Sequence, residues 1–184
     1  MPILKKDHKC VSTIACALQQ QQIVILPTDT IYGFSGILGK TAEKIAAIKG
    51  RKPDKPFIAL LAHPEQVYAY TEHKIPEKII RLWPGPVSLI VPLRDGSTQA
   101  FRCPADPWLR AVIAATGTAV YSTSVNYAGQ APLHDITAII TAFQQSVAFI
   151  VDAGHLEGQP STLIDVCGET VRIIRQGSLP LTLS

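Results

Sequence analysis

The sequence predicts a mixed α/β fold in which helices pack on a twisted open sheet. Segments with apolar residues at helical spacing are interspersed with short apolar runs, without the strict βαβ rhythm of a parallel sheet. The last two apolar runs are separated only by residues 167–170, which favours an antiparallel hairpin. The chain has 184 residues, a length typical of one domain, so we expect a single domain over residues 1–184.

Helices are expected where apolar side chains recur every three or four residues, or where a capping residue or a proline opens such a segment. Val11, Ile14 and Leu18 show this spacing in the first helix. Thr41 and Asp135 precede two of the other helices and are expected to be their N-caps. The predicted helices are residues 11–20, 41–49, 64–70, 76–83, 107–116 and 135–145.

Strands are expected where short runs rich in Val, Ile and Leu are bounded by proline, glycine or polar residues. The predicted strands are residues 23–26, 57–62, 87–93, 119–123, 147–151, 162–166 and 171–175. Residues 27–39 contain Gly33, Gly36 and Gly39 and are expected to form a loop.

Composition excludes several classes of protein. Hydrophobic residues make up 47% and charged residues 17%, the opposite of a disordered chain. No run of 18 apolar residues occurs, so we expect no spanning helix and no membrane partner. The polar N-terminus leads into an interrupted apolar stretch, a poor signal peptide, and we expect a cytoplasmic protein. The four cysteines have no CxxC spacing and are expected to be reduced thiols.

Positive charge gathers in one short segment, although the whole chain carries only +3. A stiff loop with two prolines ends this segment, and only Glu43 and Asp54 oppose its cations. Such a run is often a solvated surface, but a polyanion would relieve its self-repulsion. A triphosphate and an RNA backbone fit equally well by charge. The cations are Lys40, Lys44, Lys49, Arg51, Lys52 and Lys55.

Polar residues follow the ends of predicted strands in residues 27–33 (PTDTIYG), 122–129 (STSVNYAG) and 172–177 (RIIRQG). Ligands gather at strand ends in open α/β sheets, and small hydroxyl residues can hold phosphate or carboxylate. Each segment also has an ordinary interpretation. The first is compatible with a simple hydroxyl-capped turn. The arginines of the last could form a rim ion pair with Asp165 or Glu169.

Several common catalytic motifs are missing from the sequence. It contains no GxxxxGK[ST] and no strand-borne GxGxxG, so a bound nucleotide would be held without a P-loop. It also contains no GxSxG, which disfavours a serine hydrolase. The histidines are scattered, and no HExxH or clustered His and Cys set indicates a metal site formed by side chains.

An ordered set of motifs across nearly the whole chain resembles the YrdC family of threonylcarbamoyl-AMP synthases. The motifs are PTDTIYGFSG (27–36), KGRKPDKPF (49–57), WPGPVSLIVP (83–92), RCP (102–104), STSVNYAG (122–129), PSTLID (160–165) and IRQG (174–177). The resemblance implies a twisted mixed sheet around a concave basic cavity. It also implies an enzyme that condenses L-threonine, bicarbonate and ATP into threonylcarbamoyl-AMP and pyrophosphate.

The resemblance further implies partners and site residues. Downstream transferase proteins would pass the threonylcarbamoyl group to tRNA, and Mg²⁺ would accompany ATP, which is a substrate. Lys49 and Arg51 are expected to face the ATP phosphates as catalytic residues. The expected threonine-binding residues are Thr30, Ser122 and Ser161. The expected ATP-binding residues are Arg51, Lys55, Arg102, Ser124, Asn126 and Arg175.

The chain departs from the family pattern at several positions. Leu60 and Asp106 stand where histidine is common, Lys55 where asparagine is common, and the usual SAN triplet reads Ser-Val-Asn. Two alternatives therefore stay open. One is an adenylating activity on another amino acid, because the histidine replaced by Leu60 would help to hold the amino acid. The other is an RNA-binding paralogue that stacks bases on Tyr32 or Tyr127.

Overall fold

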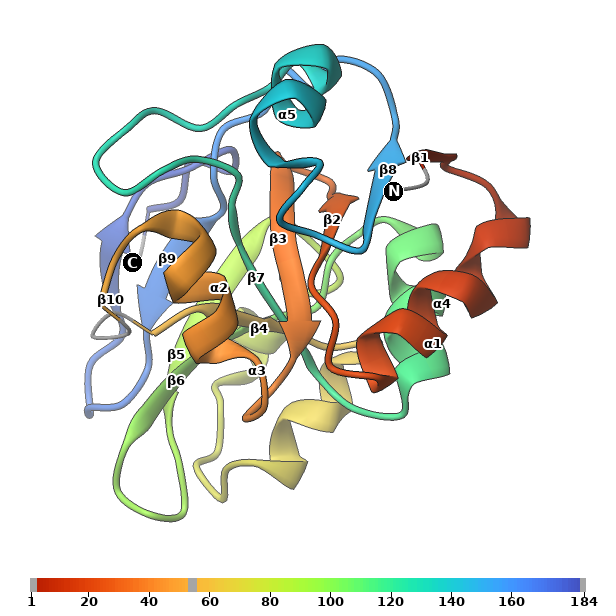
Figure 1. Cartoon of the computed structure of the whole chain (residues 1–184). Coiled ribbons are helices and arrows are strands. Elements are labelled where there is room, and N and C mark those ends of the chain that lie inside the picture. The colour runs from red at the N-terminus through yellow and green to blue at the C-terminus, as the bar shows by residue number, and fades with distance from the viewer. Residues whose placement is uncertain (1–2, 53–55, 183–184) are drawn as a thin grey trace.

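A mixed ten-stranded sheet forms the centre of the described structure (Figure 1). The structure is a computed structural model that describes residues 3–52 and 56–182. The strand order is β1-β8-β2-β3-β7-β4-β6-β5-β9-β10. The strands are β1 (Ile3–Lys5), β2 (Val24–Pro27), β3 (Tyr32–Ile37), β4 (Ile58–Leu60), β5 (Val87–Pro92), β6 (Thr98–Arg102), β7 (Val120–Ser124), β8 (Phe149–Asp152), β9 (Thr162–Asp165) and β10 (Arg172–Arg175).

The sheet contains both parallel and antiparallel pairs of strands. β1 and β2 flank β8 in parallel, and β4–β6 and β5–β9 are also parallel. The pairs β2–β3, β3–β7, β7–β4, β6–β5 and β9–β10 are antiparallel. The mixed sheet confirms the predicted fold class, and the β9–β10 pair confirms the predicted C-terminal hairpin.

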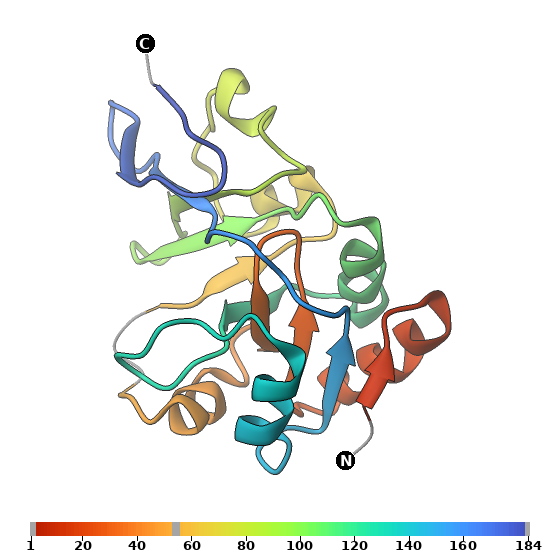
Figure 2. The same cartoon turned by 90° about the horizontal axis from the view of Figure 1, so that it is seen from above.

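Helices cover the sheet through three apolar clusters. α1 and α4 lie side by side and share one cluster with β2 (Figure 1). Phe143 of α5 packs edge-on against Phe34 of β3, with ring centroids 4.9 Å apart. The two ends of the chain lie at opposite ends of the molecule (Figure 2). The helices are α1 (Val11–Gln19), α2 (Ala42–Lys49), α3 (Glu77–Ile80), α4 (Pro107–Thr116) and α5 (Ile136–Phe143), with 3-10 turns η1 (His8–Cys10) and η2 (Pro64–Ala69).

The prediction of a loop over residues 27–39 was wrong, because this segment contains the buried strand β3. Its glycines serve close packing within the sheet. A Cβ on Gly33 would lie 2.5 Å from Oγ of Ser122 in the neighbouring β7. A Cβ on Gly36 would collide with the Thr41 hydroxyl. Glycine therefore marks close packing here, against β7 at Gly33 and against Thr41 at Gly36, and not a flexible connection.

Other differences concern short or polar elements. Two strands were not predicted: β1, which has three residues, and β6, in which polar and apolar residues mix. Residues 64–70 and 76–83 shorten to the 3-10 turn η2 and the four-residue α3. Thr41 precedes α2, but its hydroxyl donates to the Ile37 carbonyl at 3.0 Å and caps no helix N–H. Asp135 caps α5 as predicted, accepting from Ala138 N–H at 2.9 Å. No helix within residues 3–52 and 56–182 is long and apolar enough to cross a bilayer.

Candidate functional site

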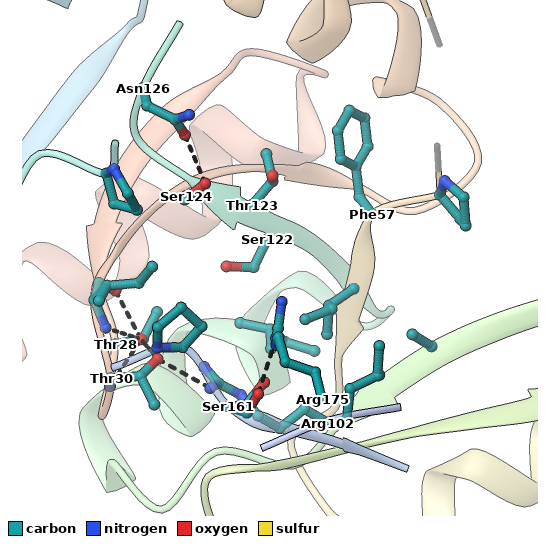
Figure 3. A pocket seen from close by; sticks show the side chains of 18 of the residues that line it. Thr28, Thr30, Phe57, Arg102, Ser122, Thr123, Ser124, Asn126, Ser161 and Arg175 are labelled. Atoms are coloured by element: carbon teal, nitrogen blue, oxygen red, sulfur yellow. Dashed lines mark hydrogen bonds between the residues drawn. The ribbon is translucent and has the colours of Figure 1, made fainter. Parts of the chain in front are cut away.

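A cavity of about 490 Å³ lies between strands β7, β4 and β6 and the β9–β10 hairpin, with the β2–β3 turn at its edge (Figure 3). Alternate residues of β4 and β6 line it, as expected for one face of a sheet. The cavity brings together residues that are far apart in the chain. Predicted site residues that border it are Thr30, Arg51, Arg102, Ser122, Ser124, Asn126, Ser161 and Arg175.

The β2–β3 turn is fixed by the hydroxyl of Thr28. This oxygen accepts from the N–H groups of Thr30 and Ile31 at 3.1 and 3.2 Å, and it donates to the Ile31 carbonyl at 2.8 Å. The hydroxyls of Thr28 and Thr30 lie 2.9 Å apart, and either can donate in this contact. The turn is the hydroxyl-capped turn that the sequence allowed, and it presents Thr30 to the cavity as a hydrogen-bond acceptor.

Arg102, at the end of β6, is the most deeply buried cation that borders the cavity, with 3% of its surface exposed. Its Nη1 donates to Thr30 Oγ1 at 3.0 Å, and its Nη2 lies 3.3 Å from Oδ1 of Asp29. Burial lowers the pKa of Arg102, and the Asp29 carboxylate opposes that shift. Because two contacts leave other N–H donors of the guanidinium uncommitted, Arg102 can meet an anion in the cavity.

Arg175, at the end of β10, also borders the cavity and lies beside Ser161 (Figure 3). Its Nη2 donates to the carbonyl of Ser161 at 2.8 Å, and the Ser161 hydroxyl lies 2.8 Å from that of Ser88. Burial lowers the pKa of Arg175 as well. Arg172 instead pairs with Asp165 at 2.7 Å outside the cavity lining, so the rim ion pair applies to Arg172 and not to Arg175.

Lys49 lies behind the cavity wall and is not among the residues that line the cavity. It ends α2 and is 3% exposed. Its ammonium donates to the Ser124 carbonyl at 2.5 Å, to the Asn126 carbonyl at 3.1 Å and to Asn126 Oδ1 at 2.9 Å. Burial, together with nearby Arg51, lowers the pKa of Lys49 to about 8. Lys49 therefore holds the segment after β7 in this structure, and its predicted contact with the ATP phosphates stays a prediction.

Hydrogen bonds within residues 124–130 also hold the segment after β7 in place. The Ser124 hydroxyl donates to Asn126 Oδ1 at 2.6 Å, and Asn126 Nδ2 donates to the carbonyls of Tyr127 and Gln130 at 3.0 and 2.7 Å. Ala128 N–H donates to the Lys49 carbonyl at 2.8 Å. Both the side chain and the backbone of Lys49 thus hold this segment against the end of α2.

Arg51 follows the left-handed Gly50 that ends α2 and is held at two points. Its backbone N–H donates to the Ala46 carbonyl at 3.0 Å. Its guanidinium lies over the ring of Phe57, 4.5 Å from the centroid. Phe57 is itself buried and packs edge-on against Tyr121, with centroids 5.8 Å apart. The stack fixes the guanidinium at the border of the cavity.

The remaining predicted residues have varied positions. Lys55 lies outside the described residues. Leu60 is fully buried and adds an apolar surface to the cavity wall. Asp106 is away from the cavity lining, where it caps α4 and pairs with Lys6.

The two tyrosines expected to stack on RNA bases differ in exposure. Tyr32 is buried, and its hydroxyl donates to the Gly154 carbonyl at 2.8 Å, so its ring cannot stack on a base. Tyr127 is exposed.

No individual role was predicted from the sequence for Asp29 or Phe57, although both contact arginines of the site. Asp29 lies within the PTDTIYG motif but was given no role of its own, and its signal is that it is acidic in an otherwise cationic set. Nothing in the sequence indicated a role for Phe57, because its contact with Arg51 arises only in the folded structure. Among the residues that the structure describes, no three His, Cys, Asp or Glu side chains gather closely enough to hold a metal ion.

The Sua5/YciO/YrdC family, described as "Telomere recombination", matches residues 16–177. The chain belongs to this family. It is 32% identical over 189 residues to the putative threonylcarbamoyl-AMP synthase of Mycobacterium tuberculosis (strain CDC 1551 / Oshkosh), covering 94% of this chain and 86% of the relative. It is 27% identical over 193 residues to the threonylcarbamoyl-AMP synthase of Bacillus subtilis (strain 168), covering 96% of this chain and 56% of that protein.

The fold agrees with solved members of the Sua5/YciO/YrdC family. P. abyssi Sua5 complexed with L-threonine superposes with a TM-score of 0.89 at 25% identity, over 98% of this chain and 59% of that one. The chain therefore spans little more than half the length of the Bacillus subtilis and P. abyssi relatives.

Proposed function

We propose that this chain makes threonylcarbamoyl-AMP and pyrophosphate from L-threonine, bicarbonate and ATP, for the threonylcarbamoyl modification of tRNA. The observation that carries the proposal is the convergence of Arg51, Arg102 and Arg175 on one cavity that also presents hydroxyl groups. The M. tuberculosis and B. subtilis relatives bear the name of this activity, and the P. abyssi relative has been solved with L-threonine.

The chemistry needs positioning and charge neutralisation more than an activated side chain. Bicarbonate takes up a proton and loses water to give CO₂, and the amine of threonine adds to CO₂ and loses a proton, giving a carbamate. A carbamate oxygen then attacks the α-phosphorus of ATP, the bond to the bridging oxygen breaks, and pyrophosphate leaves. Guanidinium groups that meet the growing charge on the phosphates favour this step, and fixed hydroxyls orient the reactants.

The residues divide into two sets in this proposal. Thr30, Ser122 and Ser161 hold the amino acid. Arg51, Arg102, Ser124, Asn126 and Arg175 hold ATP, and Lys49 supports them from behind, with Lys55 as a further phosphate contact. Thr30 borders the cavity and already accepts from Arg102, so its hydroxyl is held in place to orient the amino acid. Mg²⁺ would enter on the phosphates of ATP.

The reactivity of the product and the location of the substrates indicate the protein partners and the cellular location of this enzyme. Threonylcarbamoyl-AMP is a reactive mixed anhydride, so downstream transferase proteins that deliver the group to tRNA must take it up directly. We place the enzyme in the cytoplasm, where ATP and tRNA are both present.

The test is pyrophosphate release by the purified chain with ATP and Mg²⁺, with L-threonine and bicarbonate added or omitted in turn. Release that requires both supports the proposal. Background release from folded protein with all components present would reject it. Arg172→Ala is the matched control for Arg175→Ala, because the two arginines share β10 but only Arg175 borders the cavity.

A second candidate is the same adenylation of a different amino acid, favoured by the buried apolar side chain of Leu60 in the cavity wall. A panel of amino acids in the pyrophosphate assay separates the two candidates. Binding of RNA as the primary ligand is a third outcome. A shift in tRNA mobility that persists in excess ATP would indicate it.

A further inference from the structure

Arg102 poses a physical problem that the predicted site residues do not solve. Its guanidinium is almost fully removed from water, and Arg175 adds repulsion across the cavity. A buried charge without a partner is strongly destabilising, and a long side chain without fixed contacts would not keep one orientation. A neighbouring group must therefore balance the charge of Arg102 and fix the orientation of its guanidinium.

We infer that Asp29 is a positioning residue that fixes the Arg102 guanidinium in the cavity. The inference deepens the proposed function and rests on it in one respect, namely that ATP is the anion that Arg102 meets. Oδ1 of Asp29 lies 3.3 Å from Arg102 Nη2, and Oδ2 accepts from Ala105 N–H at 3.0 Å. One carboxylate thereby holds the Arg102 side chain and the backbone three residues beyond it.

The carboxylate is itself held still. Asp29 stands between Thr28 and Thr30 in the turn that the Thr28 hydroxyl closes. The carbonyl of Thr30 is packed so closely against Gly158 that a Cβ there would collide with it. Thr30 also accepts from Arg102 Nη1 at 3.0 Å. The β2–β3 turn thus grips the guanidinium by two groups, a carboxylate and a hydroxyl, and directs its remaining donors to the cavity.

The chain offers a matched control in Asp165. This carboxylate also pairs with an arginine, Arg172 at 2.7 Å, and also accepts from a backbone N–H two residues on, that of Cys167 at 2.9 Å. Neither Asp165 nor Arg172 borders the cavity. A general effect of losing an arginine–carboxylate pair would therefore appear in Asp165→Asn as well.

The experiment is a double-mutant cycle on kcat/KM for ATP with Asp29→Asn, Arg102→Met and both together. We expect Asp29→Asn to lower kcat/KM at least tenfold, mainly through KM, and Asp165→Asn to stay within twofold of wild type. We expect Asp29→Asn to add less than twofold in the Arg102→Met background, because its effect passes through Arg102. Equal losses in both backgrounds would overturn the inference, and so would an unchanged KM in Asp29→Asn.

A second variant covers the case in which Asp29→Asn does not fold, as judged by circular dichroism. Asp29→Glu keeps the charge but adds a methylene, so its carboxylate cannot hold Arg102 and Ala105 with the same geometry. We expect KM for ATP to rise at least threefold, and a wild-type KM would count against the inference. If the wild-type chain releases no pyrophosphate, the proposed function fails, and calorimetric titration of ATP into the same variants then tests Asp29 separately.

Discussion

Replacing Lys49 by methionine tests whether this residue contacts the phosphates or supports the cavity from behind. Methionine fills a similar volume but removes three hydrogen bonds, to the Ser124 carbonyl and to two oxygens of Asn126. Hydrogen bonds to a charged group contribute about 1.5–3 kcal/mol each, and the acceptors left behind are partly buried. The desolvation of the ammonium offsets part of that sum, so we expect a net loss of roughly 2–4 kcal/mol in the free energy of unfolding.

The activity should fall with the stability in Lys49→Met. Because the ammonium holds the segment that carries Ser124 and Asn126, we expect kcat/KM for ATP to fall about tenfold or more. Urea unfolding and pyrophosphate release measured on the same preparation give both quantities. Lys44→Met is the control, since Lys44 is an exposed residue of α2 that donates to one carbonyl, that of Gln21. An unchanged or higher free energy of unfolding together with weaker ATP binding would refute the supporting role and restore a direct phosphate contact.

Three further outcomes are expected. Arg51→Ala should lower turnover about tenfold or more, because a charged phosphate contact contributes roughly 1.5–3 kcal/mol. Unchanged turnover in the pyrophosphate assay would show that Arg51 does not contact the phosphates. Phe57→Leu should raise KM for ATP while Phe57→Tyr keeps it near wild type, because tyrosine preserves the ring beneath Arg51; equal KM values in steady-state kinetics would contradict this. The pKa of Lys49 is about 8 in the folded chain and 10.5 without burial, so the unfolded chain binds more protons between these values. The free energy of unfolding should therefore rise with pH across that window, measured by urea titration, and Lys49→Met should lack this component.

The sequence predicted the fold class well because local periodicity controls long elements. The spacing of Val11, Ile14 and Leu18 is enough to define α1, and the short interval before residue 171 is enough to define the β9–β10 hairpin. It failed at β3, where Gly33 and Gly36 are required by contacts with Ser122 and Thr41 from other parts of the chain. A glycine selected by a distant neighbour looks the same in a sequence as a glycine selected by a turn.

The candidate site shows the same limit more sharply. Motif order was sufficient to nominate Arg51, Ser124 and Arg175, and the fold brings all three to one cavity. It could not distinguish Lys49 from Arg51, two residues apart, although one lies behind the wall and the other at its border. That difference arises because the αL turn at Gly50 redirects the chain, which separates the two side chains.

The cavity gathers cations in a fold that must hold them before any anion arrives, and each is restrained by a group of a different kind. Asp29 faces Arg102, an aromatic ring lies beneath Arg51, and a backbone carbonyl accepts from Arg175. These groups limit the repulsion that the pKa of Arg102 already registers from Arg175, yet only one of them carries a full negative charge. The neutral carbonyl that faces Arg175 leaves the charge of this guanidinium for a triphosphate to neutralise. A more complete pairing of the arginines with carboxylates would stabilise the empty cavity and weaken its attraction for phosphate.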